Sequence, residues 1–305
     1  MEDWLTQPAA DLGRSIEAGD IDPRDLTETY LAAIEGHRFA DRIYARLTAD
    51  RARAEAEAAS DRAKRGLRRS PLDGVPISWK DLYDTAGVAT ESGTALLQGR
   101  VPTKDAEVLT NATGAGLVCL GKSHQTELAF SGLGLNPVTA SPPCVNDYDA
   151  ASGGSSSGAG TSVAFGLAAI GIGSDTGGSV RIPAVWNDLV GLKTKHGRLS
   201  SKGVVPLCAR FDTVGPLCRT VEDAALMLAA LENGAAADLA GAYLSDVRLG
   251  VLRTQAFNKI EEAPLAAFDG AVKRLEAAGA TVVDVDVPAV EEATVLGPTV
   301  FPAEA

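Results

Sequence analysis

The sequence predicts an α/β fold that begins with a helical N-terminal arm, and three observations support this. Residues 1–69 contain two segments with helical patterning. From residue 73 onward, short apolar runs alternate with glycine-rich turns, which is typical of strands between loops. Residues 247–288 then form an apolar segment, an amphipathic segment and a second apolar segment, the pattern of a βαβ unit. Hydrophobic residues make up 45% of the chain and charged residues 22%, so we expect a folded globular protein.

The two helices of the arm are predicted from capping and periodicity. In the segment "DPRDLTETYLAAIEGH", Asp22 can cap the helix and Pro23 suits its first position. Leu26, Tyr30 and Ile34 then form an apolar stripe. The segment "ADRARAEAEAASDRAKRG" is rich in alanine and charge, which predicts a second, largely exposed helix. We interpret the basic residues near its end as cations at a helix C-terminus rather than a binding patch.

Composition and charge exclude several classes of function. The chain has 40 acidic and 28 basic residues, and its net charge of −12 repels nucleic acid and anionic membranes. The acidic N-terminus lacks the apolar core of a secretion signal, and no apolar run reaches the roughly 18 residues that span a bilayer. Four cysteines without a close C-x-x-C pair and three histidines indicate neither a disulfide framework nor a zinc site. We therefore expect a cytoplasmic protein.

The stretch "SGGSSSGAG", residues 152–160, resembles several known loops but completes none of three common ones. A phosphate-binding P-loop needs lysine where Ala159 stands. The later "GIGSDTG" is one residue too long for a dinucleotide fingerprint. A G-x-S-x-G nucleophile elbow would centre on Ser156, but the segment before it is polar, and His196 is the single histidine downstream. The stretch runs into an apolar helical pattern at Val163, Leu167 and Ile170, so we expect it to be anchored rather than a linker.

A serine site without histidine remains, and it needs a lysine that is neutral at the working pH. Lys80 lies in the apolar segment "VPISWKDLY", where burial would lower the pKa of its ammonium group. The alternative for Lys80 is a strand lysine that points to water. A second cluster, "SDTGGSVRIP", can present backbone N–H groups to an oxyanion, with Ser179 near the start of a helix. Its alternative is a tight glycine turn with a capping serine. These alternatives stay open on local sequence alone.

Three collinear segments resemble the amidase signature family. The run from "GGSSSGAGTSVAFGLAAIGIGSDTGGSVRIP" to "HGRLS" is similar to its signature block. The segment "PLDGVPISWKDLYDTAG" is similar to its lysine segment, and "GPLCRTVEDAALML" to the helix that follows. The resemblance implies a mixed central β-sheet surrounded by helices, within one domain over 1–305. We divide that domain into the helical arm (1–69), a catalytic core (70–235) and a βαβ segment (236–305).

The resemblance also implies a Ser-Ser-Lys triad and its chemistry. Ser179 matches the nucleophile, Ser155 the bridging serine after a cis peptide bond, and Lys80 the base. Ser156 and Ser157 are then expected to be structural hydroxyls. The implied reaction is hydrolysis of a small-molecule amide through an acyl-enzyme, without cofactor or metal. The implied oxyanion donors are backbone N–H groups around Ser179, namely those of Thr176, Gly177 and Gly178.

Further residues of this chain match supporting positions of the family. Asp175 and Arg181 match residues that position the loop. The segment "ELAFSG" matches the acyl pocket, which makes Ala129, Phe130 and Ser131 candidate substrate contacts. The chain departs from the family at Ser152, where proline is usual, and near Gly160, where serine or alanine is common. Neither departure removes a catalytic group.

The resemblance leads us to expect further strands beyond the last residues, "VLGPTVFPAEA". We therefore expect a chain that needs a homo-oligomer or a partner to complete its sheet, or that has low activity alone. Two other functions stay open. One is the amidase-like component of a glutamyl-tRNA amidotransferase, which shares the triad but typically carries Asp-Glu where Thr126 precedes Glu127 here. The other is a non-enzymatic fragment or binding module that retains the signature without a closed pocket.

Overall fold

The computed structural model describes residues 2–241, 243–253 and 257–304 and divides into two compact units. The first unit is Met1–Ala237 and the second is Asp238–Ala305. The boundary lies within two residues of the division expected at 235/236. The single domain expected over 1–305 stays a prediction. No helix in the described ranges is long and apolar enough to cross a membrane.

The first unit is built on a six-stranded mixed sheet with the strand order β1-β3-β2-β4-β6-β5. The central strand β2 runs parallel to both β3 and β4, whereas β1, β6 and β5 join by antiparallel pairing. The mixed central sheet implied by the resemblance is therefore confirmed. The strand bounds are β1 Tyr44–Leu47, β2 Pro76–Lys80, β3 Val118–Ser123, β4 Ile170–Asp175, β5 Val190–Gly191 and β6 Thr213–Cys218.

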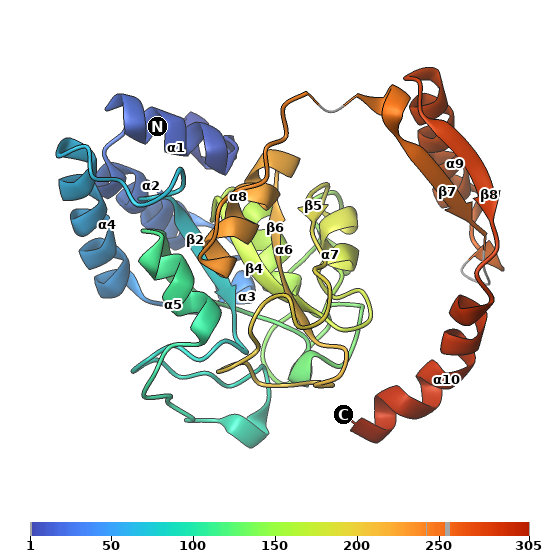
Figure 1. Ribbon diagram of the computed structural model, residues 1–305. Coiled ribbons are helices and arrows are strands. Elements are labelled where there is room, and N and C mark those ends of the chain that lie inside the picture. The colour runs from blue at the N-terminus through green and yellow to red at the C-terminus, as the bar shows by residue number, and fades with distance from the viewer. Residues whose placement is uncertain (1, 242, 254–256, 305) are drawn as a thin grey trace. The chain divides into compact units, whose positions relative to one another are not determined.

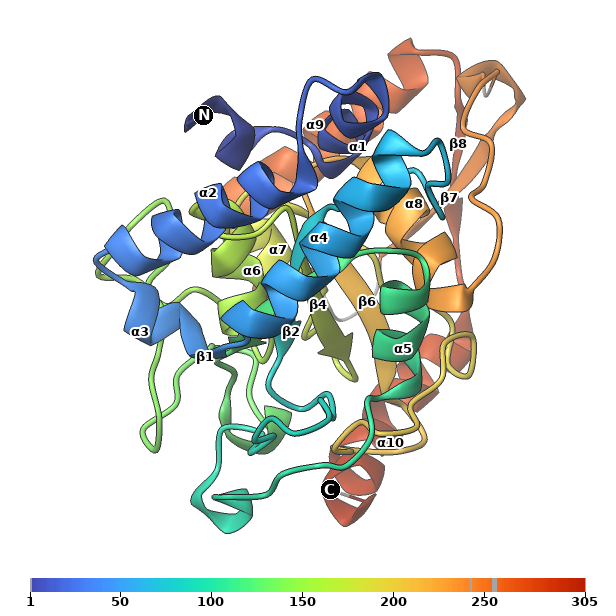
Figure 2. The same ribbon diagram turned by 90° about the vertical axis from the view of Figure 1, so that its left-hand side faces the viewer.

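Helices cover both faces of this sheet. Figure 2 shows α2, α4 and α5 in front of the strands, with α6 and α7 behind them, and Figure 1 shows the same layers from the side. Helix α6 packs on β2, β4 and β6, so it covers the centre of the sheet. The helices of this unit are α1 Ala9–Ala18, α2 Pro23–Gly36, α3 Ala40–Ile43, α4 Ala49–Lys64, α5 Glu107–Gly114, α6 Ser157–Ala164, α7 Arg181–Trp186 and α8 Val221–Glu232. Short 3-10 turns are η1 Glu2–Thr6, η2 Ala95–Leu97 and η3 Glu127–Ala129.

The arm contains both predicted helices. Helix α2 begins at Pro23, and the Asp22 carboxylate accepts a hydrogen bond from the Arg24 amide (3.0 Å). The apolar stripe of α2 is fully buried in the main core. Helix α4 buries one alanine face and exposes its charged face, as its composition predicted. At its end, Arg62 pairs with the buried Asp73 (2.6 Å), which supports the helix-terminus interpretation.

The arm also contains elements that the sequence did not predict. Helices α1 and α3 lie within it, and so does β1, which forms one edge of the sheet by pairing with β3. β1 has four residues, too few for an alternating pattern to be visible, and it exists because β3 offers it a free edge. The helix predicted to run through Val163, Leu167 and Ile170 is wrong in extent. Helix α6 ends at Ala164, and Ile170 begins the buried strand β4, because a run that is apolar on all sides suits either element.

The second unit confirms the βαβ prediction. Strands β7 Arg248–Leu252 and β8 Thr281–Val285 pair in parallel, with helix α9 Glu262–Ala277 between them. A short turn η4 Leu244–Asp246 precedes β7, and helix α10 Pro288–Glu304 follows β8. Neither of these two elements was predicted.

Candidate active site

Lys80 ends β2, the central strand, and all five residues of β2 are buried. Its side chain is completely buried, which rules out the alternative of a lysine pointing to water. Its Nζ donates to Ser155 Oγ (2.7 Å) and to Ser174 Oγ (2.8 Å). Burial lowers the pKa of Lys80 to about 7, against the opposing charges of Asp175 and Asp212. A large part of Lys80 is therefore neutral near pH 7.

Ser155 lies in the loop that leads into helix α6, and its peptide bond to Gly154 is cis. The side chain is fully buried, and its carbonyl accepts from the Thr126 amide (3.1 Å). The next serine is structural, as predicted, because Ser156 Oγ bonds to the backbone of Ser174 (3.2 Å). A nucleophile elbow at Ser156 is excluded, since this buried hydroxyl is fixed within the protein and no strand immediately precedes the loop.

Ser179 lies in the loop between β4 and α7, two residues before the helix begins. Its carbonyl accepts a hydrogen bond from the Ser156 amide (3.3 Å), which joins the two serine loops. Asp175, at the end of β4, anchors this loop by accepting from the Gly178 amide (2.8 Å) and from the Arg181 guanidinium (3.0 Å). Burial opposes the ionisation of Asp175, but the Arg181 hydrogen bonds lower its pKa below the usual range. Asp175 and Arg181 thus hold the loop, as the resemblance implied.

The residues expected to form the oxyanion hole lie together in this loop, but their N–H groups differ in availability. Gly177 is exposed, and a Cβ built on it would meet no atom within 4 Å. The Gly178 amide already donates to Asp175, so its role toward an oxyanion stays a prediction. Within the described part of the chain, the amides of Gly177 and Ser179 donate to no acceptor.

The three candidate substrate contacts lie beside the Ser155 loop. Ala129 is buried in the turn η3 and Phe130 is half exposed (51%). Two hydrogen bonds attach the segment after Ser131 to the Ser155 loop. They run from the Gly154 amide to the Gly132 carbonyl (2.8 Å) and from the Gly153 amide to the Leu133 carbonyl (3.1 Å). The fold therefore brings these residues near the triad, and their contact with a substrate stays a prediction.

Sequence reasoning missed three residues of the site. Ser174 is the second acceptor for Lys80, and its place within "GIGSDTGGS" could have indicated it. The Tyr83 hydroxyl donates to the Gly173 carbonyl (2.6 Å) and so fixes the strand next to Ser174. Asp212 accepts from the Thr176 hydroxyl (2.5 Å), a contact that no local pattern indicates.

No metal site or histidine joins this arrangement. In the described ranges, no group of three His, Cys, Asp or Glu side chains could hold a metal ion. His196 contacts the carbonyl of Ala209 through its ring nitrogen (2.9 Å) and is exposed. Three groups far apart in sequence therefore meet in the core, from β2, the loop before α6 and the loop after β4.

The family model described as Amidase matches residues 25–305 of the chain. The chain belongs to the amidase signature family. A crystal structure described as an amidase superposes on it with a TM-score of 0.88 and 31% sequence identity, covering 98% of this chain and 68% of that one. The native peptide amidase from Stenotrophomonas maltophilia matches with a TM-score of 0.83 and 32% identity, covering 98% of this chain and 66% of that one. These likenesses confirm the amidase-signature fold.

Curated relatives of this family member include the A-type subunit of the glutamyl-tRNA(Gln) amidotransferase from Anaeromyxobacter dehalogenans (strain 2CP-C). The two proteins are 38% identical over 291 residues, which is 90% of this chain. The chain spans 59% of that relative's length.

Proposed function

We propose that this chain hydrolyses a carboxylic amide to an acid and an amine or ammonia, through an acyl-enzyme on Ser179. The observation that carries this proposal is the hydrogen bond from Lys80 Nζ to Ser155 Oγ (2.7 Å) deep in the core. A lysine with a pKa of about 7 can accept a proton near neutral pH, which an exposed lysine does not do. Such a group replaces the histidine of other serine hydrolases.

The reaction then proceeds by a proton relay. Ser155 passes its proton to neutral Lys80 and takes the proton of Ser179, whose Oγ attacks the amide carbonyl carbon. As the C–N bond breaks, Lys80 returns its proton through Ser155 to the leaving nitrogen, and an ester on Ser179 remains. Water attacks this ester by the same relay, which releases the acid and restores the Ser179 hydroxyl.

The negative charge on the carbonyl oxygen needs donors that are already in place. The amides of Gly177 and Ser179 suit this role, because they donate to no acceptor within the described part of the chain. Removing one such donor typically lowers the rate by about 10²–10³-fold. The acyl group of the substrate would lie against the segment of Ala129, Phe130 and Ser131, next to the same loop.

The proposal is tested on Ser179 directly. A serine-directed phosphonate should label the wild-type protein on Ser179, and mass spectrometry of the peptides locates the label. The variant Ser179→Ala should keep its cooperative melt but lose both the label and amide turnover. A label on Ser156 would favour the nucleophile elbow instead. A folded wild-type chain that takes no label would favour a binding module that retains the signature.

A second candidate function is that of the amidase-like component of a glutamyl-tRNA amidotransferase, which the curated relatives favour. That function would use the same triad to release ammonia from glutamine. Thr126 stands where such components typically carry aspartate, and its amide and hydroxyl donate to the Ser155 and Ser131 carbonyls (3.1 and 3.2 Å). Co-purification with a second protein, together with transfer of glutamine nitrogen to a charged tRNA, would support it. Turnover of small amides in the absence of such a partner supports the hydrolase.

A further inference from the structure

Asp212 lies immediately before β6, at the end of the sheet where the nucleophile loop begins. Strand β6 is antiparallel to β4, with Thr213 opposite Asp175. The Thr213 hydroxyl donates to the Asp175 carbonyl (2.6 Å). Asp212 is therefore placed next to Thr176, the first residue of the loop that carries Ser179.

The Asp212 carboxylate joins two loops. Its Oδ1 accepts from the Thr176 hydroxyl (2.5 Å), and its Oδ2 accepts from the Leu207 amide (2.9 Å). The Cys208 amide contacts both oxygens at 3.1 Å. A carboxylate held by three donors has a fixed position, so it fixes the Thr176 side chain in turn.

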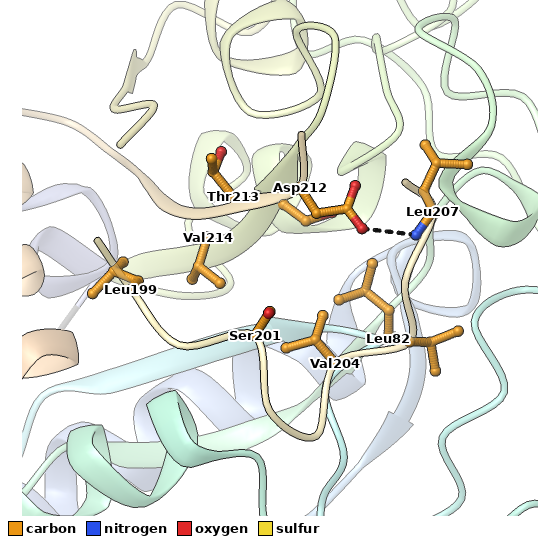
Figure 3. Close-up of a pocket in the computed structure, with 10 residues that line it drawn as sticks. Leu82, Leu199, Ser201, Val204, Leu207, Asp212, Thr213 and Val214 are labelled. Atoms are coloured by element: carbon orange, nitrogen blue, oxygen red, sulfur yellow. Dashed lines mark hydrogen bonds between the residues drawn. The ribbon is translucent and has the colours of Figure 1, made fainter. Parts of the chain in front are cut away.

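Asp212 also lines a small pocket close to Lys80. Figure 3 shows its carboxylate bonded to Leu207, with Leu82, Val204 and Val214 around the pocket. The pocket has a volume of about 10 Å³, and Ser174 lines it together with Asp212. Ser174 in turn accepts the hydrogen bond from Lys80 Nζ. Because much of the lining is apolar, the charge of Asp212 is weakly screened toward Lys80.

We propose that Asp212 is a positioning residue for amide hydrolysis, which fixes Thr176 beside the nucleophile and keeps a negative charge near Lys80. This inference rests on the proposed function of the Ser179 site. Asp212 does not touch the reacting atoms in this scheme. It acts through Thr176 on the geometry of the oxyanion loop and through its charge on the base.

Lys80 has few charged neighbours that could mask this effect. The charges that favour its ammonium form belong to Asp175 and Asp212, and Asp175 is itself paired with Arg181. On the side of β3, the buried Lys122 donates to the Tyr83 carbonyl (2.5 Å) and lies 3.6 Å from Asp81. The Tyr83 hydroxyl stays neutral, because burial raises its pKa well above the usual value.

The direction of the effect follows from the sign of the charge. The negative charge of Asp212 stabilises protonated Lys80, so removing that charge lowers the pKa of Lys80 below about 7. Because the neutral form is the base, the pH at which acylation reaches half its maximum should move downward. A nearby opposite charge typically shifts a pKa by about one unit or more, so we expect a shift of about one pH unit.

The experiment measures the rate of Ser179 labelling by a phosphonate between pH 5 and 9 in four proteins. Asp212→Asn removes the charge, and its half-maximum should lie about one pH unit below that of the wild type. Thr176→Val removes the hydroxyl contact but keeps the charge, so its maximum rate should fall without a shift in pH. Glu222→Gln removes one negative charge from an exposed ion pair with Arg14 and should change neither value.

An Asp212→Asn variant that labels more slowly but with the wild-type half-maximum would overturn the role of the charge and leave a purely structural residue. If Asp212→Asn does not fold, Asp212→Ser provides the same test, because it is neutral and can still accept from Thr176. A titration of the Lys80 side chain by NMR gives a second measurement that needs no reaction. Absence of any label on wild-type Ser179 would contradict the proposed function, whereas an unchanged Lys80 titration in the Asp212 variants would contradict this inference alone.

Discussion

Lys80 Nζ lies 2.7 Å from Ser155 Oγ, although the two residues are 75 positions apart in the chain. Strand β2 delivers the lysine and the loop before α6 delivers the serine. Helix α6 packs on β2 and β4, so it holds that loop against the lysine. The contact is completely buried, and the predictions below depend on it.

The first prediction concerns the triad as a unit. Lys80→Ala and Ser155→Ala should each lower the rate of amide turnover by several orders of magnitude. The double variant should be little worse than either, because removing one member already disables the relay. The wild-type rate should rise with pH with a midpoint near 7, where Lys80 loses its proton.

His196→Ala serves as the control for the triad, since its ring contacts a backbone carbonyl at an exposed position. It should change turnover by less than about twofold. A large loss in this variant would show that a histidine takes part in the reaction and that the triad assignment is wrong.

A second prediction addresses Ser174, the other hydrogen-bond acceptor for Lys80. Ser174→Ala removes one of the two contacts that orient the amine. A hydrogen bond of this kind contributes about 1 kcal/mol, so turnover should fall roughly 3–10-fold. Ser162→Ala is the matched control, because its buried hydroxyl bonds to Ser78 and to the Ala159 carbonyl rather than to Lys80. Equal rates for the two variants would show that Ser174 does not orient the base.

The third prediction tests the packing of α6 on β4. A Cβ on Gly171 would lie 2.3 Å from the Ala159 carbonyl oxygen in α6. Gly171→Ala should therefore lower the free energy of unfolding by about 1–3 kcal/mol or more, measured by urea denaturation. It should also slow Ser179 labelling, because the helix that follows Ser155 must move.

Gly36→Ala is the control for this change, since a Cβ at the end of α2 meets no atom within 4 Å. Its free energy of unfolding should stay within about 0.5 kcal/mol of the wild type. Full stability in Gly171→Ala would mean that α6 does not approach β4 as closely as described.

A fourth prediction links the buried lysines to stability. The pKa of Lys80 falls from its usual 10.5 to about 7 in the folded state, chiefly through burial. Between these pH values the unfolded chain binds more protons at this residue than the folded one. The free energy of unfolding should therefore rise with pH between about 7 and 10, by up to ~1.4 kcal/mol per pH unit for one such group. Lys122, whose pKa burial lowers to about 8, contributes in the same direction at higher pH.

Urea denaturation at pH 7 and pH 9 measures this slope. Lys80→Met should reduce the rise in the free energy of unfolding, whereas Lys202→Met, at a side chain that is 84% exposed, should leave it unchanged. An equal slope in wild type and Lys80→Met would show that Lys80 stays protonated in the folded protein.

Local sequence determined the parts of this protein that depend on near neighbours. The capping pair Asp22 and Pro23, the buried stripe of α2 and the parallel βαβ unit all follow from spacings of a few residues. The triad residues were found through three collinear motifs, whose residue types and separations are visible without a structure. The same motifs predicted the loop anchors Asp175 and Arg181.

Tertiary structure alone decided what those residues experience. Whether Lys80 points to water or into the core depends on which strands flank β2, and these come from positions about 40 and 90 residues downstream. The edge strand β1 exists because β3 is there to pair with it. Ser174 and Asp212 joined the site because β4 and β6 end side by side, a pairing that no local pattern records. Burial and long-range strand pairing set the pKa of the base, and both are properties of the assembled sheet.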